Sequence, residues 1–170
     1  MNIFFLSEDP IEAARMQCDR HVVKMILESA QLLSTAHREN DGDEWADEVG
    51  LYKRTHKNHP SAVWARQSSE HYAWLYHHFE ALCDEYRYRY GKEHLTWRKL
   101  SDVLGNQPRN IGEGWVDPPQ CMPDKYKHDS CVQAYRNYYA LDKGSNYWFG
   151  YDKSRPAPDF ISHMQIGNYR

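Results

Sequence analysis

Hydrophobic residues recur every three or four positions in three stretches of the chain, which is the period of an amphipathic α-helix. These stretches cover residues 19–37, 61–90 and 129–142. Shorter helices are expected from about residue 10 to a break near Cys18, and over 94–104. The apolar run at 2–6 is expected to be extended or a short strand. The pattern predicts an all-α fold, a three-helix core with long loops and an aromatic C-terminal tail.

Turn-forming residues separate the predicted helices. An acidic loop is expected over 39–50, an irregular loop rich in Gly and Pro over 105–123, and a tail rich in Tyr and Trp over 146–160. Gly91 is a helix stop signal. We find no internal repeat and no domain boundary, so residues 1–170 are expected to form a single domain.

Composition changes the predicted fold little, but it excludes some classes of protein. The chain of 170 residues is 41% hydrophobic and carries a net charge of −3, as expected of a soluble globular protein that does not coat nucleic acid non-specifically. Four cysteines form no CxxC pair, and no segment has the length of a signal peptide or a transmembrane helix. The expected location is the cytoplasm, that of the host cell if a phage encodes the protein.

The first long helix carries a polar stripe of chemically varied residues. His21, Lys24 and Glu28 follow Gln17 and precede Gln31 at spacings of three and four, so they share one helix face. A solvated face would explain this stripe, but an imidazole, an ammonium and a carboxylate within two turns also suit a reactive site. We expect these three residues to line one pocket, with Asn58 or His59 at its rim and an imidazolium at His21.

Metal binding is not favoured by the residue spacing. The ten histidines include the pairs His56–His59 and His71–His78, but no Cys or carboxylate spacing completes a zinc site. Most of the histidines are expected to be half-buried hydrogen-bonding groups. P-loop, dinucleotide-binding, Gly-x-Ser-x-Gly and His-Glu-x-x-His motifs are absent from the sequence.

Basic residues alternate with aromatic ones at 52–57, 86–92 and 135–155. Arg and Lys contact phosphates, and Tyr and Trp stack on unpaired or flipped bases, so the pattern favours DNA as a partner. Packing between Tyr-rich helices explains the pattern equally well. If DNA is the partner, one face should carry Arg20, Lys24 and Lys57 with at least one of Lys143, Lys153 and Arg155.

Several motifs resemble known proteins. Cys-Asp-Arg-His-Val-Val-Lys-Met at 18–25 and Asn-His-Pro-Ser at 58–61 are similar to a set of uncharacterised phage proteins, over nearly the whole chain. More remotely, the chain resembles the pyrimidine-dimer DNA glycosylases of the endonuclease V type. That likeness rests on Arg-x-x-x-basic at 20–24, the Asn-His-Pro segment and the long helix ending in Glu-Tyr-Arg-Tyr-Arg-Tyr-Gly.

The glycosylase resemblance implies roles for individual residues. In that family the amine exposed by removal of methionine attacks the deoxyribose C1′, a glutamate that follows an arginine assists, and a basic residue three positions further on holds phosphate. Arg20 and Lys24 match the basic positions, and His21 stands where the glutamate belongs. Since bulky Asn2 favours retention of Met1, the expected nucleophile is the Met1 amine or Lys24. Glu28 can supply the missing carboxylate.

The sequence therefore predicts a DNA-binding phage protein, a DNA glycosylase/lyase or related base-directed enzyme acting on damaged or modified bases. The expected catalytic residues are Lys24, His21, Glu28 and Met1, and the expected substrate-binding residues are Arg20, Lys57, Asn58, His59, Trp64, Tyr147 and Trp148. No cofactor and no metal are expected. Two alternatives stay open: a non-catalytic phage accessory protein that binds a host protein or a nucleotide, and a His-rich metalloenzyme.

Overall fold

The computed structural model describes residues 1–161, and within them the regular structure is helical, without β-strands. This confirms the predicted all-α class. The α-helices are α1 (Pro10–Arg15), α2 (Asp19–Asp41), α3 (Glu44–Glu48), α4 (Pro60–Gln67), α5 (Ser69–Tyr90), α6 (Leu95–Leu104) and α7 (Cys131–Leu141), with short 3-10 helices η1 (Asp124–Tyr126) and η2 (Lys143–Ser145).

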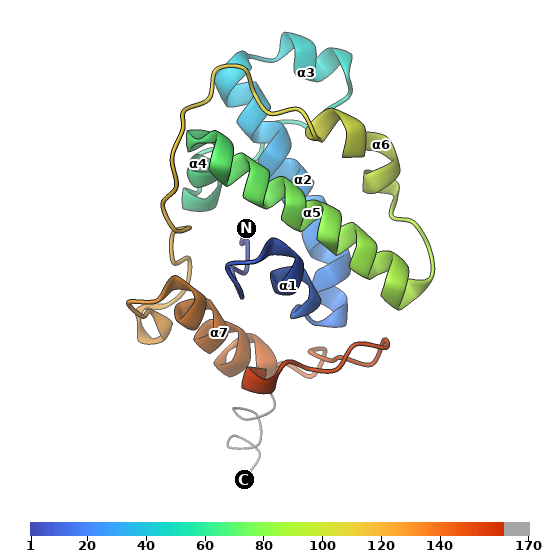
Figure 1. Cartoon of the computed structure of the whole chain (residues 1–170), viewed down its shortest axis with the longest axis vertical. Coiled ribbons are helices and arrows are strands. Elements are labelled where there is room, and N and C mark those ends of the chain that lie inside the picture. Colours follow the sequence, from blue (N-terminus) through green and yellow to red (C-terminus); the bar gives the residue numbers. More distant parts are fainter. Residues whose placement is uncertain (162–170) are drawn as a thin grey trace.

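Helix α2 is the centre of the fold. It packs against α5 and α4, and α1 packs on α5. Figure 1 shows α2 and α5 crossing, with α3 at one end of α2 and α7 on the side of its other end. Helix α2 begins at the predicted residue, Asp19, and extends one turn beyond the predicted end before Gly42 caps it with φ 85°. Its buried residues include Val22, Ile26 and Leu33.

The prediction of one helix over 61–90 is wrong, because the chain breaks at Ser68. Ser68 has an extended backbone, and its Oγ accepts a hydrogen bond from the His71 N–H at 3.1 Å, which caps α5. The Ser69 N–H donates to the Gly112 carbonyl at 2.8 Å. Any Cβ at residue 112 would lie 2.7 Å from the Gln67 carbonyl oxygen. The loop over 105–123 therefore approaches the backbone closely enough to divide the helix.

The acidic loop expected over 39–50 contains helix α3, which sequence reasoning missed. The buried guanidinium of Arg38 explains its position. Arg38 donates to the carboxylates of Asp43 and Asp47 at 3.0 and 2.8 Å, and to the carbonyl oxygens of Leu51 and Tyr52. A charged group 5% exposed is stable only when its donors are satisfied, and this segment satisfies them.

The segment before α1 is neither a strand nor exposed. Residues 3–6 are buried, and Figure 1 shows the N-terminus near the middle of the molecule. Phe4 has φ 56°, a left-handed conformation that is strained for a bulky side chain. The Asn2 side chain holds the turn: its Oδ1 accepts from the Phe4 N–H at 2.8 Å, and its Nδ2 donates to the Cys121 carbonyl at 3.1 Å.

The aromatic tail is tied to the helices by a buried ion cluster. The Arg89 side chain donates to Glu85 at 2.8 Å and to Asp19 at 3.1 Å. Glu85 also accepts from Arg155, and Asp19 accepts from the Asp152 N–H at 2.7 Å. Because both carboxylates bind the tail as well as Arg89, this cluster joins the start of α2, the end of α5 and the tail.

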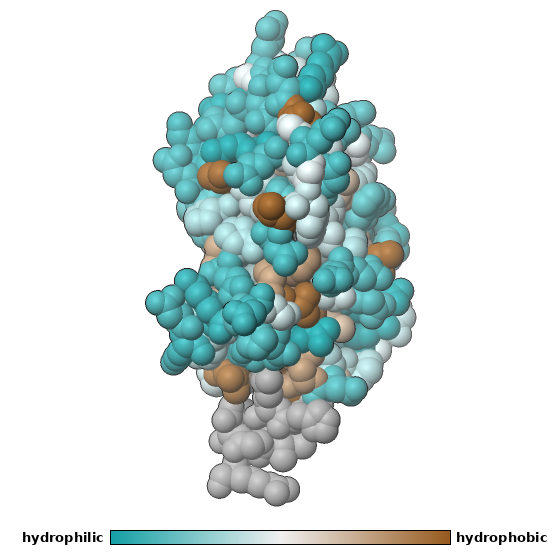
Figure 2. All heavy atoms as spheres, turned by 60° about the vertical axis from the view of Figure 1, so that its left-hand side comes forward, coloured by the Kyte–Doolittle hydropathy of each residue, from teal (hydrophilic) through white to brown (hydrophobic). Residues whose placement is uncertain are grey.

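The outer surface is polar for the most part. Figure 2 shows a largely hydrophilic face on which apolar side chains appear singly or in a narrow band near the middle. Among residues 1–161, no helix combines the length and the hydrophobicity needed to cross a membrane.

Candidate active site

The polar stripe of α2 opens onto a pocket of about 300 Å³ that we call the amine pocket. It lies between the N-terminal segment, α2, the start of α4 and the region of α7. The residues that line it are Met1, Asn2, Phe4, His21, Lys24, Met25, Glu28, His59, Cys121, Tyr138 and Lys143. Helical spacing places His21, Lys24 and Glu28 on one face, and the buried N-terminal segment brings residue 1 beside them.

The structure therefore brings together five residues expected from the sequence: Met1, His21, Lys24, Glu28 and His59. The other polar residues that we expected at the site lie outside this pocket. Arg20, Lys57 and Asn58 are exposed, and their side chains do not line it. Arg20 is nevertheless one helical turn before Lys24, and Lys57 and Asn58 immediately precede His59.

His21 is a buried, neutral histidine. It is 5% exposed, and its ring stacks on Phe4 with 4.7 Å between the ring centroids. Burial, with Lys143 and Lys24 nearby, lowers the pKa of His21 to about 3. The imidazolium that we expected beside Lys24 is therefore wrong. An acid–base role at neutral pH would require an environment other than the one this ring occupies.

A tyrosine hydroxyl fixes the orientation of this ring. Nδ1 of His21 lies 2.8 Å from the Tyr139 hydroxyl oxygen, which also accepts a hydrogen bond from the Cys18 N–H at 2.8 Å. The hydroxyl proton is then directed at Nδ1, and we assign the ring proton to Nε2. His21 consequently acts as an N–H donor, not as a replacement for a carboxylate.

The charge around the amine pocket is mainly positive. Lys24 and Lys143 both act on the pKa of His21, and the N-terminal ammonium adds to the burial that lowers the pKa of His59. Glu28 is the one carboxylate among the lining residues. Within residues 1–161 neither lysine nor Glu28 forms an ion pair within 4.0 Å, so these charges are available to a ligand.

This arrangement suits attack by an amine on an anionic substrate. An amine needs a carboxylate near it to take up protons and to stabilise a developing cation, and Glu28 follows Lys24 by one helical turn. The surplus of positive charge attracts phosphate groups. The concave pocket joining the first residue, Lys24 and Glu28 favours an enzyme over an accessory protein with a flat aromatic surface.

The three predicted base-stacking residues differ in their surroundings. Trp64 is buried at 2% exposure, its ring stacks on His71, and its Nε1 donates to the Val116 carbonyl at 2.8 Å, so its proposed contact with a base is wrong. Trp148 is half-buried, with 5.2 Å between its ring centroid and that of His21. Tyr147 is 97% exposed and free to stack.

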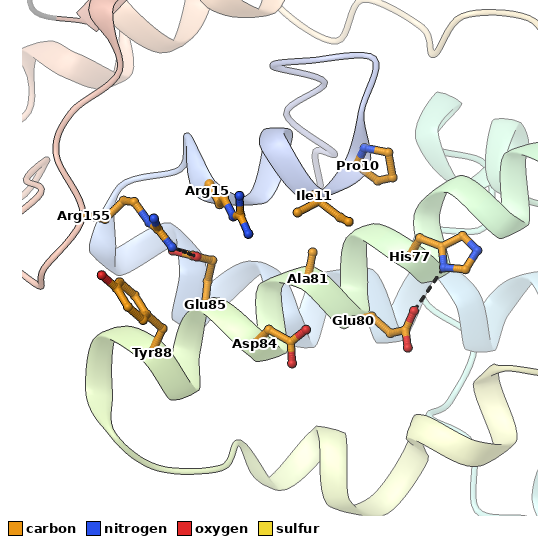
Figure 3. A pocket seen from close by; sticks show the side chains of 10 residues that line it. All are labelled: Pro10, Ile11, Arg15, His77, Glu80, Ala81, Asp84, Glu85, Tyr88 and Arg155. Atoms are coloured by element: carbon orange, nitrogen blue, oxygen red, sulfur yellow. Dashed lines mark hydrogen bonds and ion pairs between the residues drawn. The ribbon is translucent and has the colours of Figure 1, made fainter.

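A separate groove between α1 and α5 has a larger volume, about 600 Å³, but its charges are paired, either with one another or with neighbours outside the groove. Figure 3 shows Arg155 directed at Glu85 and His77 directed at Glu80. Arg155 therefore belongs to this groove and does not line the amine pocket, whereas Lys143 does.

The described histidines form hydrogen bonds, as predicted, but only His59 and His94 are half-buried, whereas His21, His37, His71 and His78 are buried. His71 contacts the Trp64 carbonyl through Nδ1 and the Val116 N–H through Nε2, at 2.8 and 3.0 Å. His78 bridges the Pro10 carbonyl and the Gln17 side chain. No group of three or more His, Cys, Asp or Glu side chains within residues 1–161 has the geometry of a metal site.

Six lining residues were absent from the predicted catalytic and substrate-binding residues: Asn2, Phe4, Met25, Cys121, Tyr138 and Lys143. Of these, only Lys143 had been named as a candidate for the basic face. Cys121 and Tyr138 lie more than 90 positions from Lys24 along the chain, and no local pattern connects them with it. The unbroken apolar run at 3–6 was the available signal for Phe4, since a run without polar positions indicates burial on all sides.

The structure is that of an all-α protein in which two amines and a carboxylate line one pocket. The sequence model of the pyrimidine dimer DNA glycosylase family matches residues 1–99, and the chain belongs to this family. This confirms the resemblance inferred from the sequence. The protein is therefore DNA glycosylase-like in its general function, with DNA as its class of partner. No curated protein and no solved structure matches the chain.

Proposed function

We propose that this protein is a DNA glycosylase and AP lyase that acts on damaged or modified bases through an amine of the amine pocket. One observation carries the proposal: two amines, on Met1 and Lys24, line a pocket with the Glu28 carboxylate in a chain of this family. The motifs at 18–25 and 58–61 further support a phage origin.

The proposed reaction begins with the neutral amine attacking C1′ of the deoxyribose. The bond between C1′ and the base nitrogen breaks, the base leaves with the electron pair, and it gains the proton that the amine loses. The bond from C1′ to O4′ then opens, O4′ takes up a proton, and a protonated imine remains between C1′ and the enzyme. Abstraction of a C2′ proton would then expel the 3′ phosphate, which is the lyase step.

The other residues of the site have supporting roles in this proposal. Glu28 takes up the proton of the amine, passes it to the leaving base and stabilises the cationic sugar, the task that the family assigns to a glutamate at the position of His21. His21 donates a hydrogen bond through Nε2 to the sugar or to phosphate. Lys143, Arg20 and Lys57 contact phosphates, with Asn58 and His59 at the rim, and Trp148 and Tyr147 stack on exposed bases.

Borohydride trapping tests the proposal directly, because hydride converts the imine to a stable secondary amine. The protein is incubated with duplexes that each contain one damaged or modified base or an abasic site. A covalent adduct is expected, and peptide mass spectrometry of the adduct identifies the nucleophile as the first residue or Lys24 and also determines the mature N-terminus. If none of the duplexes yields an adduct, the imine chemistry is excluded.

Lys24→Ala provides the matched comparison. If Lys24 is the nucleophile, the variant gives no adduct; if the α-amine is, the variant still gives one, with weaker DNA binding. The melting temperature should be nearly unchanged in either case, because Lys24 is exposed and makes no hydrogen bond or ion pair within the described chain. Lys99→Ala, at an exposed lysine of α6, is the control and should behave like the unmodified protein.

A further inference from the structure

A second polar pocket lies at the other end of α2 from the amine pocket. We call it the His37 pocket. Its volume is about 640 Å³, and its lining residues are His37, Asp41, Trp45, Asn106, Gln107, Arg109 and Asn110. These residues come from the end of α2, from α3 and from the loop after α6, three segments that Figure 1 shows close to one another. At a rise of 1.5 Å per residue, His37 lies about 20 Å from Lys24 along the helix axis.

A buried nitrogen without a partner distinguishes this pocket. His37 is 1% exposed, and its Nε2 lies 2.9 Å from the Tyr72 hydroxyl, which donates its own proton to the Leu104 carbonyl at 2.7 Å. Tyr72 must therefore accept from His37, so the ring proton is on Nε2 and Nδ1 is a bare acceptor. Within residues 1–161, Nδ1 has no hydrogen-bond partner. A buried acceptor without a partner is rare in a folded protein, and a hydrogen-bond donor on a ligand would satisfy it.

The protonation state of His37 agrees with this assignment. Burial lowers the pKa of His37, although the Asn106 backbone and the Asp41 carboxylate act in the opposite direction. The ring is therefore neutral at physiological pH, and Nδ1 keeps its lone pair. Nε2 faces Tyr72, and the ring lines the pocket beside the Asn106 backbone.

An aromatic ring and a cation complete the walls. Trp45 is 38% exposed, with 5.0 Å between its ring centroid and that of His37. The exposed side chains of Gln107 and Arg109 make no hydrogen bond or ion pair to the described residues. Their loop is nevertheless held in place, because the Asp41 carboxylate accepts three hydrogen bonds from Arg109 and Asn110, at 2.8 to 2.9 Å.

We propose that the His37 pocket binds a nucleotide. The base stacks on Trp45 and donates an N–H to Nδ1 of His37, amide groups of Asn106 and Gln107 pair with the base edge, and Arg109 contacts the phosphate. Nδ1 is buried in the present arrangement, so the Trp45 ring, whose centroid lies 5.0 Å from that of His37, shifts outward when the base enters. The proposal does not depend on imine chemistry in the amine pocket. The nucleotide can be free or part of a DNA strand.

Calorimetric titration of the full-length protein with the four deoxynucleoside monophosphates, the matching nucleosides and a short single-stranded oligonucleotide tests this inference. Saturable binding with one ligand per chain is expected. Trp45→Leu should weaken it by about tenfold or more, because base stacking on an aromatic ring is lost. Arg109→Ala should weaken the binding of nucleotides and leave that of nucleosides unchanged. Trp115→Leu and Arg98→Ala, at exposed residues outside the pocket, are the controls.

The possible results answer two questions: whether the site exists, and whether its ligand is a free nucleotide or part of a DNA strand. Binding of free monophosphates assigns a free nucleotide, and binding of the oligonucleotide alone assigns a base within DNA, provided that Trp45→Leu weakens it. If Trp45→Leu does not fold, Gln107→Ala replaces it, since that side chain is exposed. Absence of binding by all these ligands, or equal binding by the pocket variants and the controls, would overturn the proposal. Borohydride trapping is a separate readout, so either proposal can fail alone.

Discussion

At the scale of single residues, one hydroxyl of Tyr139 satisfies two buried groups, the Cys18 N–H and Nδ1 of His21. Tyr139→Phe would leave both without a partner, and we expect the free energy of unfolding to fall by about 1–3 kcal/mol. Urea unfolding at neutral pH measures this difference. Tyr147→Phe removes a hydroxyl from a side chain that is 97% exposed and should change stability by less than about 0.5 kcal/mol. Equal effects of the two variants would contradict the role assigned to Tyr139.

The sequence was informative about residues wherever helical spacing decided their position. His21, Lys24 and Glu28 were expected in one pocket and line one. Spacing failed where a distant segment changed the environment of a helix face. Gln17 lies in the polar stripe but is fully buried, because it bonds to His78 of α5, and Leu27 lies on the apolar face but is 41% exposed.

At the scale of helices, Ser68 separates α4 from α5. Its Oγ caps α5, and we expect Ser68→Ala to destabilise the protein by about 0.5–2 kcal/mol, the usual effect of losing an N-cap side chain. Thermal or urea unfolding checks this value. Ser69→Ala is the control, because that hydroxyl bonds only to the exposed Glu70 and its loss should matter little. A larger loss of stability from Ser69→Ala than from Ser68→Ala would contradict the capping role.

Helix boundaries divide into those with local causes and those with distant ones. The capping side chain before α1 and Gly91 after α5 made the start of α1 and the end of α5 predictable, since these signals lie beside the helix they bound. Ser68 is a capping residue too, but the apolar seam continues at 3.6-residue spacing through both helices and hides the break there. Its cause is Gly112, which approaches from a loop more than 40 residues away.

At the scale of the whole molecule, buried histidines make stability dependent on pH. The pKa is lowered, chiefly by burial, for His21 to about 3 and for His78 to about 4, and it is also lowered for His37, His59, His71 and His94. In the unfolded chain these histidines are protonated near pH 6.5, whereas in the folded protein they are protonated only at lower pH. The free energy of unfolding should therefore fall as pH drops below about 6.5, with each histidine contributing up to about 1.4 kcal/mol per pH unit.

Urea unfolding between pH 7.5 and about 5 tests this dependence before most carboxylates titrate. His78→Gln should reduce the slope, because the imidazole that it removes is fully buried. Gln107→Ala should leave the slope unchanged, because that side chain is exposed and does not ionise. A flat profile across this range, or equal slopes for both variants, would show that the buried histidines do not control acid stability.

The charge of the whole molecule also predicts how it binds DNA. With a net charge of −3, affinity should come from local cations, so it should fall with rising salt concentration but with the slope of a few phosphate contacts. Lys143→Ala should reduce the slope of log affinity against log salt concentration by about one, and Lys99→Ala should not. Binding that shows no dependence on salt would remove the phosphate role of the amine pocket. Fluorescence anisotropy with labelled duplexes measures both slopes.

The buried N-terminal segment has a consequence for the order in which the protein folds during synthesis. The first residues to leave the ribosome find their native partners only after most of the chain has been made: Asn2 bonds to Cys121, Phe4 packs against Tyr139, and the Leu6 carbonyl accepts from Arg136. Helices α1 to α6 can pack against one another before this segment has its native contacts. The amine pocket is consequently completed late, and ribosome-bound chains that end before α7 would carry Lys24 and Glu28 on a helix without the pocket around them.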